Sequence, residues 1–172
     1  HIDGDIAAGD LGGQRLGHAD ETRLGSGVIA LARVAGGPAL AILIAQAHKG
    51  VEIAALTITA GNVGLNHTIA NALKLCEVAK IEAPIFPGAA IPLVASPEDA
   101  AYVHGLDGFG DTGYTKASDK ALQSDHAALA MIRLSHQHKD ALTFVMLGPL
   151  TNLALALSLD PTLPSRVPRL VI

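Results

Sequence analysis

The chain has 172 residues, which suffices for one domain with a substantial core and is too short for two domains of ordinary size. Hydrophobic residues make up 49% of it and charged residues 16%, a composition typical of globular proteins and not of disordered ones. The formal net charge is -4 and the basic residues are scattered along the chain, so no basic patch is available for a phosphate backbone and nucleic acid is not expected as a partner.

A membrane-spanning segment is the first structure to consider in chain order, because residues 28–47 form a long apolar run. Arg33 and the sequence Gly36-Gly37-Pro38 interrupt this run, and both a charge near the middle of a span and a proline disfavour insertion. We therefore expect two segments that meet at a turn, and no membrane partner.

The rest of the chain alternates short apolar runs with helix-period segments, a pattern typical of a parallel sheet covered by helices. The predicted strands are 51–59, 84–86, 142–147 and 169–172. The predicted helices are 39–47, 66–80, 127–136 and 150–159, with a further helix start at 96–99. Asn66 or Thr68 is expected to cap the second helix. The predicted fold class is α/β, with a mostly parallel open sheet and helices on both faces.

The single cysteine, Cys76, excludes an internal disulfide and a cysteine-rich zinc site, and fits a reducing compartment. We expect it to be a small buried hydrophobic residue on its helix. The chain begins at His1 without the features of a signal peptide, which favours a cytoplasmic location, although a processed or truncated start would look the same.

Two polar turns follow predicted strands. Asn62 follows the strand that ends near Thr59, and Gly148 follows the strand that ends near Leu147. Ligands of open parallel sheets bind at the carboxyl ends of the strands. The alternative is that Gly61 and Asn62 tolerate left-handed backbone angles and that Gly148 only forms a turn. Position alone leaves both interpretations open.

Three motifs occur in order along the chain: ITAGN at 58–62, VHGLDGFG at 103–110 and LGPLTNLALAL at 147–157. Together they resemble the inosine-uridine type nucleoside hydrolases, which cleave the N-glycosidic bond of purine and pyrimidine ribonucleosides in their catabolism. The resemblance covers 39–172, which is therefore expected to be a partial, truncated nucleoside hydrolase-like α/β domain. Residues 1–38 are expected to be a divergent N-terminal segment.

The resemblance implies a calcium site and a nucleoside site. Ca²⁺ would be held by carboxylates and by the main-chain carbonyl of Leu147, in keeping with the preference of this ion for oxygen ligands. Asn62 would hydrogen-bond the ribose, and His104 would lie near the leaving base. The simpler alternatives are that Asn62 only turns the chain and that His104 is a solvent-exposed loop residue.

The sequence departs from the family in its aspartate-rich signature, D-x-D-P-G-x-D-D. The aligned stretch, 31–38, contains no carboxylate. Asp3, Asp5 and Asp10 reproduce the spacing of three of the four aspartates, with Gly9 in place of the fourth. Under this alternative Asp5 and Asp10 would be metal ligands, and Asp5 would also be the catalytic base.

Family members also continue past the strand predicted at 169–172, so we expect a fragment or a degenerate copy whose exposed edge favours self-association into homo-oligomers. Two hypotheses follow: a nucleoside N-ribohydrolase, or a catalytically inactive domain with weak ligand or partner binding. An unrelated nucleotide-binding domain is disfavoured, because neither G-x-G-x-x-G nor a P-loop follows any predicted strand.

Overall fold

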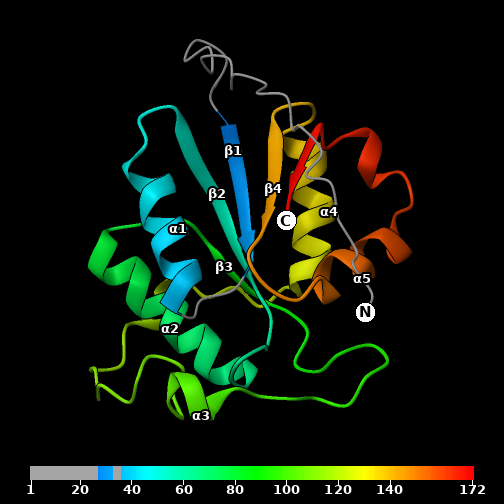
Figure 1. The fold of residues 1–172 in the computed structure, drawn as a ribbon. Helices are drawn as coiled ribbons and strands as arrows, with labels where there is room; N and C mark the ends of the chain where they lie inside the picture. The colour runs from blue at the N-terminus through cyan, green and yellow to red at the C-terminus, as the bar shows by residue number, and fades with distance from the viewer. Residues whose placement is uncertain (1–26, 33–35) are drawn as a thin grey trace, which may run out of the picture.

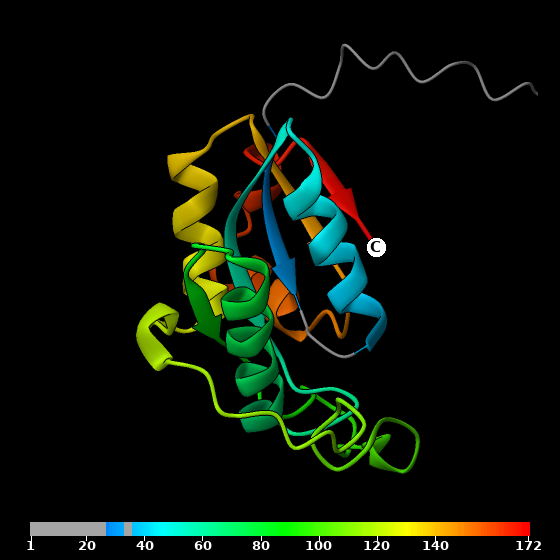
Figure 2. The same ribbon diagram turned by 90° about the vertical axis from the view of Figure 1, so that its left-hand side faces the viewer.

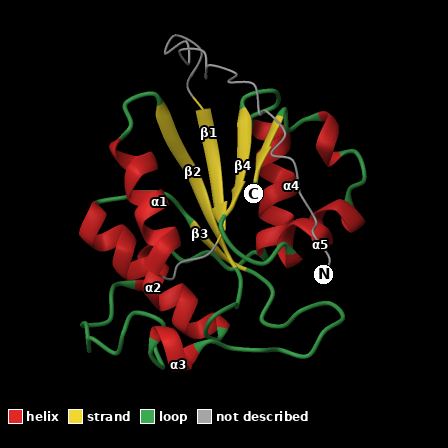
Figure 3. Ribbon diagram, in the orientation of Figure 1, coloured by secondary structure: helices red, strands yellow, loops and turns green. Residues whose placement is uncertain are grey.

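The computed structural model describes residues 27–32 and 36–172. Its described strands form one parallel sheet in the order β3-β2-β1-β4-β5 (Figures 1 and 3). The strands are β1 (Gly27–Ala32), β2 (Val51–Ile58), β3 (Ile85–Pro87), β4 (Leu142–Met146) and β5 (Arg169–Val171). The α/β prediction with a mostly parallel sheet is confirmed, and the strands predicted at 51–59 and 142–147 lie in this one sheet with β1 between them.

The helices cover both faces of the sheet, with α1 and α2 on one side and α4 and α5 on the other (Figures 1 and 2). They are α1 (Gly36–Ala47), α2 (Leu65–Ala79), α3 (Ala101–His104), α4 (Ala127–Gln137) and α5 (Thr151–Leu159). Two short 3-10 helices, η2 (Asp119–Ala121) and η3 (Leu163–Ser165), join the later elements. Helices on both faces are the ordinary consequence of crossover connections between parallel strands.

The sheet separates two apolar cores. On one face Leu142, Phe144 and Met146 of β4 pack with α4 and α5. On the other face Ile53 of β2 packs with α1 and α2. A bulge in the β1–β2 pairing inserts Ala54, and the extra residue shifts the alternation, so that Ile53 reaches the same core as Leu56 and Ile58. Cys76 is buried in this core, as predicted, and burial raises the pKa of its thiol to about 11.

The apolar run at 28–47 forms two separate elements, β1 and α1, in agreement with the prediction of two segments. No helix within 27–32 and 36–172 is long and apolar enough to cross a membrane. No strand was predicted at the position of β1, which nevertheless lies in the centre of the sheet between β2 and β4.

Two predictions about helix starts are wrong. The residue before α2 is Gly64, which provides no side-chain cap, and the Thr68 hydroxyl instead donates to the Leu65 carbonyl at 2.9 Å. The helix expected from 96–99 begins only at Ala101 and is a single turn. Asp99 does accept a hydrogen bond from the Ala101 N–H at 3.1 Å, but residues 96–100 form a loop and not a helix.

Candidate functional site

The carboxyl ends of β2, β3 and β4 lie at one edge of the sheet, where the arrows point in Figure 1. Beyond this edge lies a cavity of about 250 Å³. It is lined by the loop after β2 (59–61 and 63–64), the loop after β3 (89–92 and 97–99), and Pro149 and Thr151 after β4. This is the edge at which open parallel sheets bind ligands.

Asn152 of α5 holds the floor of this cavity in place. Its side chain is completely buried. The amide nitrogen donates to the Ile58 carbonyl at 2.9 Å, and the amide oxygen accepts from the Ala89 N–H at 2.8 Å. One side chain therefore satisfies backbone groups at the ends of two neighbouring strands, which would otherwise be buried without partners.

The loop after β3 is joined to the loop after β2 as well. The Ala89 carbonyl accepts hydrogen bonds from the Ala60 N–H at 2.9 Å and from the Thr59 hydroxyl at 3.1 Å. Gly88 is required here, because a Cβ at this position would lie 2.3 Å from the Asn152 amide oxygen and 2.5 Å from the Ile58 carbonyl. The cavity floor is thus fixed by interlocking backbone contacts.

Asn62 is half-buried between two cavity-lining residues, Gly61 and Val63, but does not itself line the cavity. Its carbonyl accepts a hydrogen bond from the Ala100 N–H at 2.7 Å. Neither Gly61 nor Asn62 is among the residues of positive φ in the described part of the chain. The alternative that these residues are present for left-handed backbone angles is therefore wrong, and the side chain of Asn62 needs another explanation.

His104 is half-buried at the end of α3. Its N–H donates to the Ala100 carbonyl at 3.0 Å, and its carbonyl accepts from the Gly110 N–H at 2.8 Å. Ala100 is also the residue that bonds to Asn62. The structure therefore brings Asn62 and His104 into one hydrogen-bonded group of loops through their main chains.

The loop after His104 is internally bonded. The Asp107 carboxylate accepts from the Phe109 N–H at 2.6 Å and from the Asp111 N–H at 3.0 Å, and the Asp111 carboxylate accepts from the Asp107 N–H at 3.1 Å. The hydrogen bond from Phe109 is the main cause that lowers the pKa of Asp107 below its ordinary value. Both aspartates lie in the loop and outside any helix or strand.

A buried amide attaches this loop to α2. Asn71 is fully buried, donates to the Asp107 carbonyl at 2.9 Å and accepts from the Tyr114 hydroxyl. Gly108 has φ +79°, and a Cβ there would lie 2.8 Å from Val63, a cavity-lining residue. The glycines of the VHGLDGFG motif thus allow the loop to pack closely under the candidate site.

Leu147 directly follows β4 and is half-buried, with its side chain packed on the α1 and α2 side of the sheet. The turn after it supplies Pro149 to the cavity lining. Leu147 thus lies at the same sheet edge as the loop that carries Asn62. A common ligand for the Asn62 amide and the Leu147 carbonyl stays a prediction.

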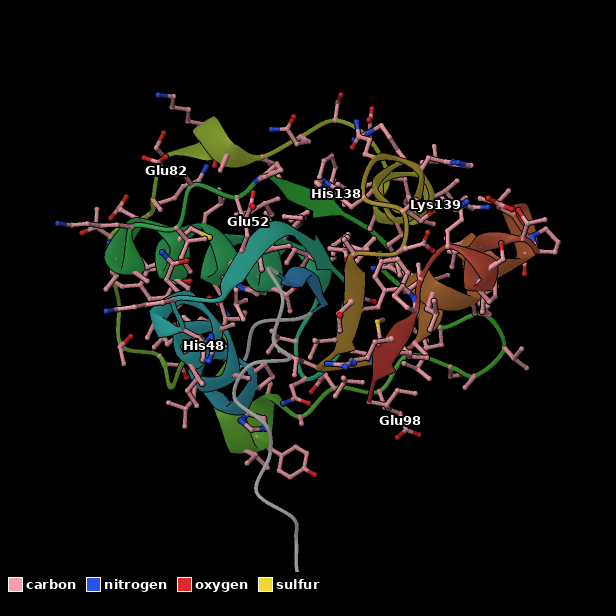
Figure 4. The ribbon with its side chains drawn as sticks, turned by 90° about the horizontal axis from the view of Figure 1, so that it is seen from above. His48, Glu52, Glu82, Glu98, His138 and Lys139 are labelled. Carbon is pink, nitrogen blue, oxygen red and sulfur yellow. The ribbon has the colours of Figure 1, made fainter. Side chains whose placement is uncertain are left out.

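The described residues do not fit the expected calcium site. Residues 27–32 and 36–172 contain no group of three or more histidine, cysteine, aspartate or glutamate side chains that could hold a metal ion. Glu98 and Asp99 line the cavity, but one oxygen of Asp99 accepts from Ala101, and Glu98 lies at the periphery in Figure 4. Asp3, Asp5 and Asp10 lie outside the described residues.

A second group of ionisable side chains surrounds the opposite edge of the sheet. His48, Glu52, Glu82 and His138 line a cavity of about 530 Å³ near the amino end of β2 and are labelled in Figure 4. The His48 ring nitrogen Nδ1 accepts from the Gly50 N–H at 3.1 Å. Because ligands of open parallel sheets bind at the carboxyl edge, this cavity is not the candidate site.

The sequence did not predict the two buried amides that hold the loops of the candidate site, those of Asn71 and Asn152. Asn152 belongs to the GPLTN motif, and its signal was an amide in the first turn of a mostly apolar helix. The partners of Asn152 lie 94 and 63 residues away in the chain, and Asp107 lies 36 residues from Asn71. No local pattern reveals such pairings.

Comparisons with known proteins agree with this geometry. The family model described as inosine-uridine preferring nucleoside hydrolase matches residues 35–172. The chain is 38% identical to the non-specific ribonucleoside hydrolase RihC of Escherichia coli (strain SE11), over 78% of this chain and 44% of that protein. It is 35% identical to the probable uridine nucleosidase 2 of Oryza sativa subsp. japonica, over 77% of this chain and 40% of that protein.

A similar solved structure is the plant nucleoside hydrolase PpNRh1, with a TM-score of 0.78 and 32% identity over 84% of this chain and 46% of the enzyme. An inosine-guanosine nucleoside hydrolase gives a TM-score of 0.75 with 35% identity, over 83% of this chain and 45% of that protein. The chain therefore spans less than half the length of the relatives that it matches.

Proposed function

Because the chain belongs to the inosine-uridine preferring nucleoside hydrolase family, we propose that it binds a ribonucleoside at the carboxyl edge of its sheet. The reaction proposed for this site is hydrolysis of the N-glycosidic bond to ribose and free base, in the catabolism of purine and pyrimidine nucleosides in the cytoplasm. The observation that carries the proposal is the cavity of about 250 Å³ at that edge, in a fold whose relatives are named for this reaction.

Asn62 is proposed to hydrogen-bond the ribose hydroxyls. Support comes from its backbone, which has no positive φ and so does not demand an asparagine. Further support comes from the position of Asn62 between two residues that line the cavity. An amide offers both donors and an acceptor, which suits a vicinal diol. His104 is proposed to lie near the base, since its loop is bonded to the same Ala100.

Hydrolysis demands a base for the attacking water, and the family resemblance adds a Ca²⁺ ion. The described residues offer no ligand cluster for that ion. Asp5 and Asp10 are therefore proposed as its ligands, with the Leu147 carbonyl, and Asp5 as the base.

The second candidate function is nucleoside binding without turnover. A specific observation favours it: the stretch 31–38, which aligns with the aspartate-rich signature, contains no carboxylate. Without a catalytic base and a set of metal ligands, the cavity would hold the ribose and base but would not activate water.

One experiment separates the two candidates. The purified chain is incubated with inosine or uridine and Ca²⁺, and both free base and bound nucleoside are measured. Release of base that is lost in Asp5→Asn and Asp10→Asn supports the hydrolase. Binding without release supports the non-catalytic domain. Absence of both in the presence and absence of Ca²⁺ contradicts a nucleoside function altogether.

A further inference from the structure

The cavity at the carboxyl edge of the sheet carries charge of one sign. Glu98 and Asp99, both exposed and both in the loop after β3, line it. Among the described residues that line this cavity, none is a lysine, an arginine or a histidine. The other lining residues are small or apolar, apart from the hydroxyl groups of Thr59 and Thr151. A ligand in the cavity therefore meets negative charge on the wall that the loop after β3 forms.

Donors at the floor of the cavity are used within the protein. The Ala60 N–H and the Thr59 hydroxyl both donate to the Ala89 carbonyl, at 2.9 Å and 3.1 Å. The Ala89 N–H donates to the amide oxygen of Asn152 at 2.8 Å. These groups have little left to offer to an acceptor on a ligand.

The acidic wall has acceptors to spare. The Glu98 carboxylate forms no hydrogen bond or ion pair with any residue of 27–32 and 36–172. Asp99 uses Oδ1 to accept from the Ala101 N–H at 3.1 Å, which leaves Oδ2 for a ligand. An ionised carboxylate is an acceptor and never a donor, so this wall suits a ligand group that donates hydrogen bonds.

A nucleoside in the proposed site brings one edge of its base to this wall. The ribose is proposed at Asn62 and the base near His104. Ala100 bonds to both, since its N–H donates to the Asn62 carbonyl at 2.7 Å and its carbonyl accepts from the His104 N–H at 3.0 Å. Asp99 directly precedes Ala100 in the chain. The substituents at purine C6 and pyrimidine C4 lie far from the glycosidic bond, so they and not the ribose face the wall.

We propose that Glu98 and Asp99 are specificity-determining residues that favour ribonucleosides with an exocyclic amino group at this position over those with an oxo group. Adenosine is then preferred to inosine, and cytidine to uridine. The proposal rests on the proposed nucleoside site and defines its substrate class more narrowly.

The chemistry of the two base types decides the preference. A carboxylate accepts hydrogen bonds from an amino group, as glutamate and aspartate do from the amino group of cytosine in DNA. An oxo group turns lone pairs toward the carboxylate, and the two repel. The ring N–H of inosine or uridine also donates, but the oxo group beside it offsets the gain. Because both carboxylates are exposed, solvent and salt screen them, and we expect a roughly tenfold preference that shrinks at high ionic strength.

Calorimetric titration of the chain with these four nucleosides tests the proposal, because the members of each pair share the ribose and differ little in size. Adenosine and cytidine should bind roughly tenfold more tightly than inosine and uridine. Where free base is released, the ratio of kcat/KM replaces the ratio of Kd.

The variant Glu98→Gln with Asp99→Asn should reduce the preference to about twofold or less, because an amide serves an oxo group as well as an amino group. Asparagine keeps an acceptor for the Ala101 N–H. The matched control is Glu52→Gln with Glu82→Gln, which removes two charges from exposed residues at the opposite edge of the sheet and should keep the preference. Each ratio compares two ligands on one variant, so partial unfolding affects both ligands alike.

The outcomes separate this proposal from the proposed function. Equal affinities within either pair, tighter binding of the oxo member, or equal ratios in the Glu98→Gln/Asp99→Asn variant and the control variant would overturn the specificity proposal and leave the nucleoside site standing. Failure of all four nucleosides to bind, with and without Ca²⁺, would overturn the proposed function and the specificity proposal with it.

Discussion

At the residue scale, the buried side-chain amide of Asn152 connects α5, the end of β2 and the loop after β3. Its two hydrogen bonds join α5 to the end of β2 and to the loop after β3. The partners are backbone groups at the edge that forms the floor of the cavity. The contribution of this side chain is therefore to position the candidate site, with no need for contact with a ligand.

Replacement of Asn152 should destabilise the fold. Asn152→Leu keeps the branched arrangement of the side-chain heavy atoms but leaves the Ala89 N–H and the Ile58 carbonyl without partners, which should cost about 2–5 kcal/mol of unfolding free energy. Urea unfolding measures this loss. Asn66→Ala, at an exposed position in the first turn of α2, is the control and should change stability by less than about 0.5 kcal/mol. A loss for Asn152→Leu no larger than that of the control would contradict the assigned role.

At the scale of elements, the loop of residues 105–114 is held to α2 through Asn71. Because Asn71 bonds to both Asp107 and Tyr114, Asn71→Ala should release the loop more than it releases the rest of the domain. We expect proteases to cut this variant between residues 105 and 116 roughly several-fold faster than they cut the parent chain. Thr115→Ala, at an exposed site, is the control. Unchanged cleavage of Asn71→Ala would show that other contacts hold the loop.

A second junction of elements lies between α4, α5 and η3. Arg166 is 7% exposed, donates to the Ser135 hydroxyl at 3.0 Å and the Thr162 hydroxyl at 2.7 Å, and forms an ion pair with Asp160. The hydrogen bond from the Thr162 hydroxyl, followed by that from Arg166, lowers the pKa of Asp160 below its ordinary value of 3.8. His136 also approaches Asp160, at 3.8 Å.

This junction should make stability depend on acid pH. Since the folded-state pKa of Asp160 is depressed, its contribution is present above pH 3.8 and is lost as the pH falls through the folded-state value. Thermal unfolding from about pH 5 to about pH 2.5 should therefore show a steeper fall in Tm for the parent than for Asp160→Asn. Asp140→Asn is the control, since Asp140 is exposed at positive φ, a conformation that asparagine also adopts. Identical slopes for the parent and Asp160→Asn would exclude the mechanism.

The fold was predictable from the sequence where packing follows local periodicity. The apolar runs of β2 and β4 and the helical repeat of α2 were identified within one or two residues at their ends. β1 was missed because its apolar residues continue into α1, which hides the boundary between strand and helix. The prediction that Asn66 or Thr68 caps α2 was wrong, because the Thr68 hydroxyl donates to the Leu65 carbonyl instead. The residue type alone does not decide between a capping hydrogen bond and one of this kind.

The candidate site was predictable in position but not in its construction. The turns after β2 and β4 lie at the sheet edge that also holds the cavity, since the carboxyl ends of parallel strands coincide. The contacts that shape the cavity join Gly88, Asn152 and Ile58, which are brought together only by the tertiary fold. The residues expected to hold the metal, Asp5 and Asp10, lie outside the described part of the chain.

At the scale of the whole molecule, the proposed function requires that a ribonucleoside binds at the carboxyl edge of the sheet with Asn62 at its ribose. Calorimetric titration with inosine tests this most directly. We expect saturable one-to-one binding of inosine, weakened in Asn62→Gly by about 1–3 kcal/mol, or about 5- to 150-fold, and unchanged in Asn66→Ala. Glycine keeps the Asn62 carbonyl that bonds to Ala100, so the turn itself is preserved. Failure of the parent chain to bind inosine or uridine, with and without Ca²⁺, or equal binding by Asn62→Gly, would contradict the claim.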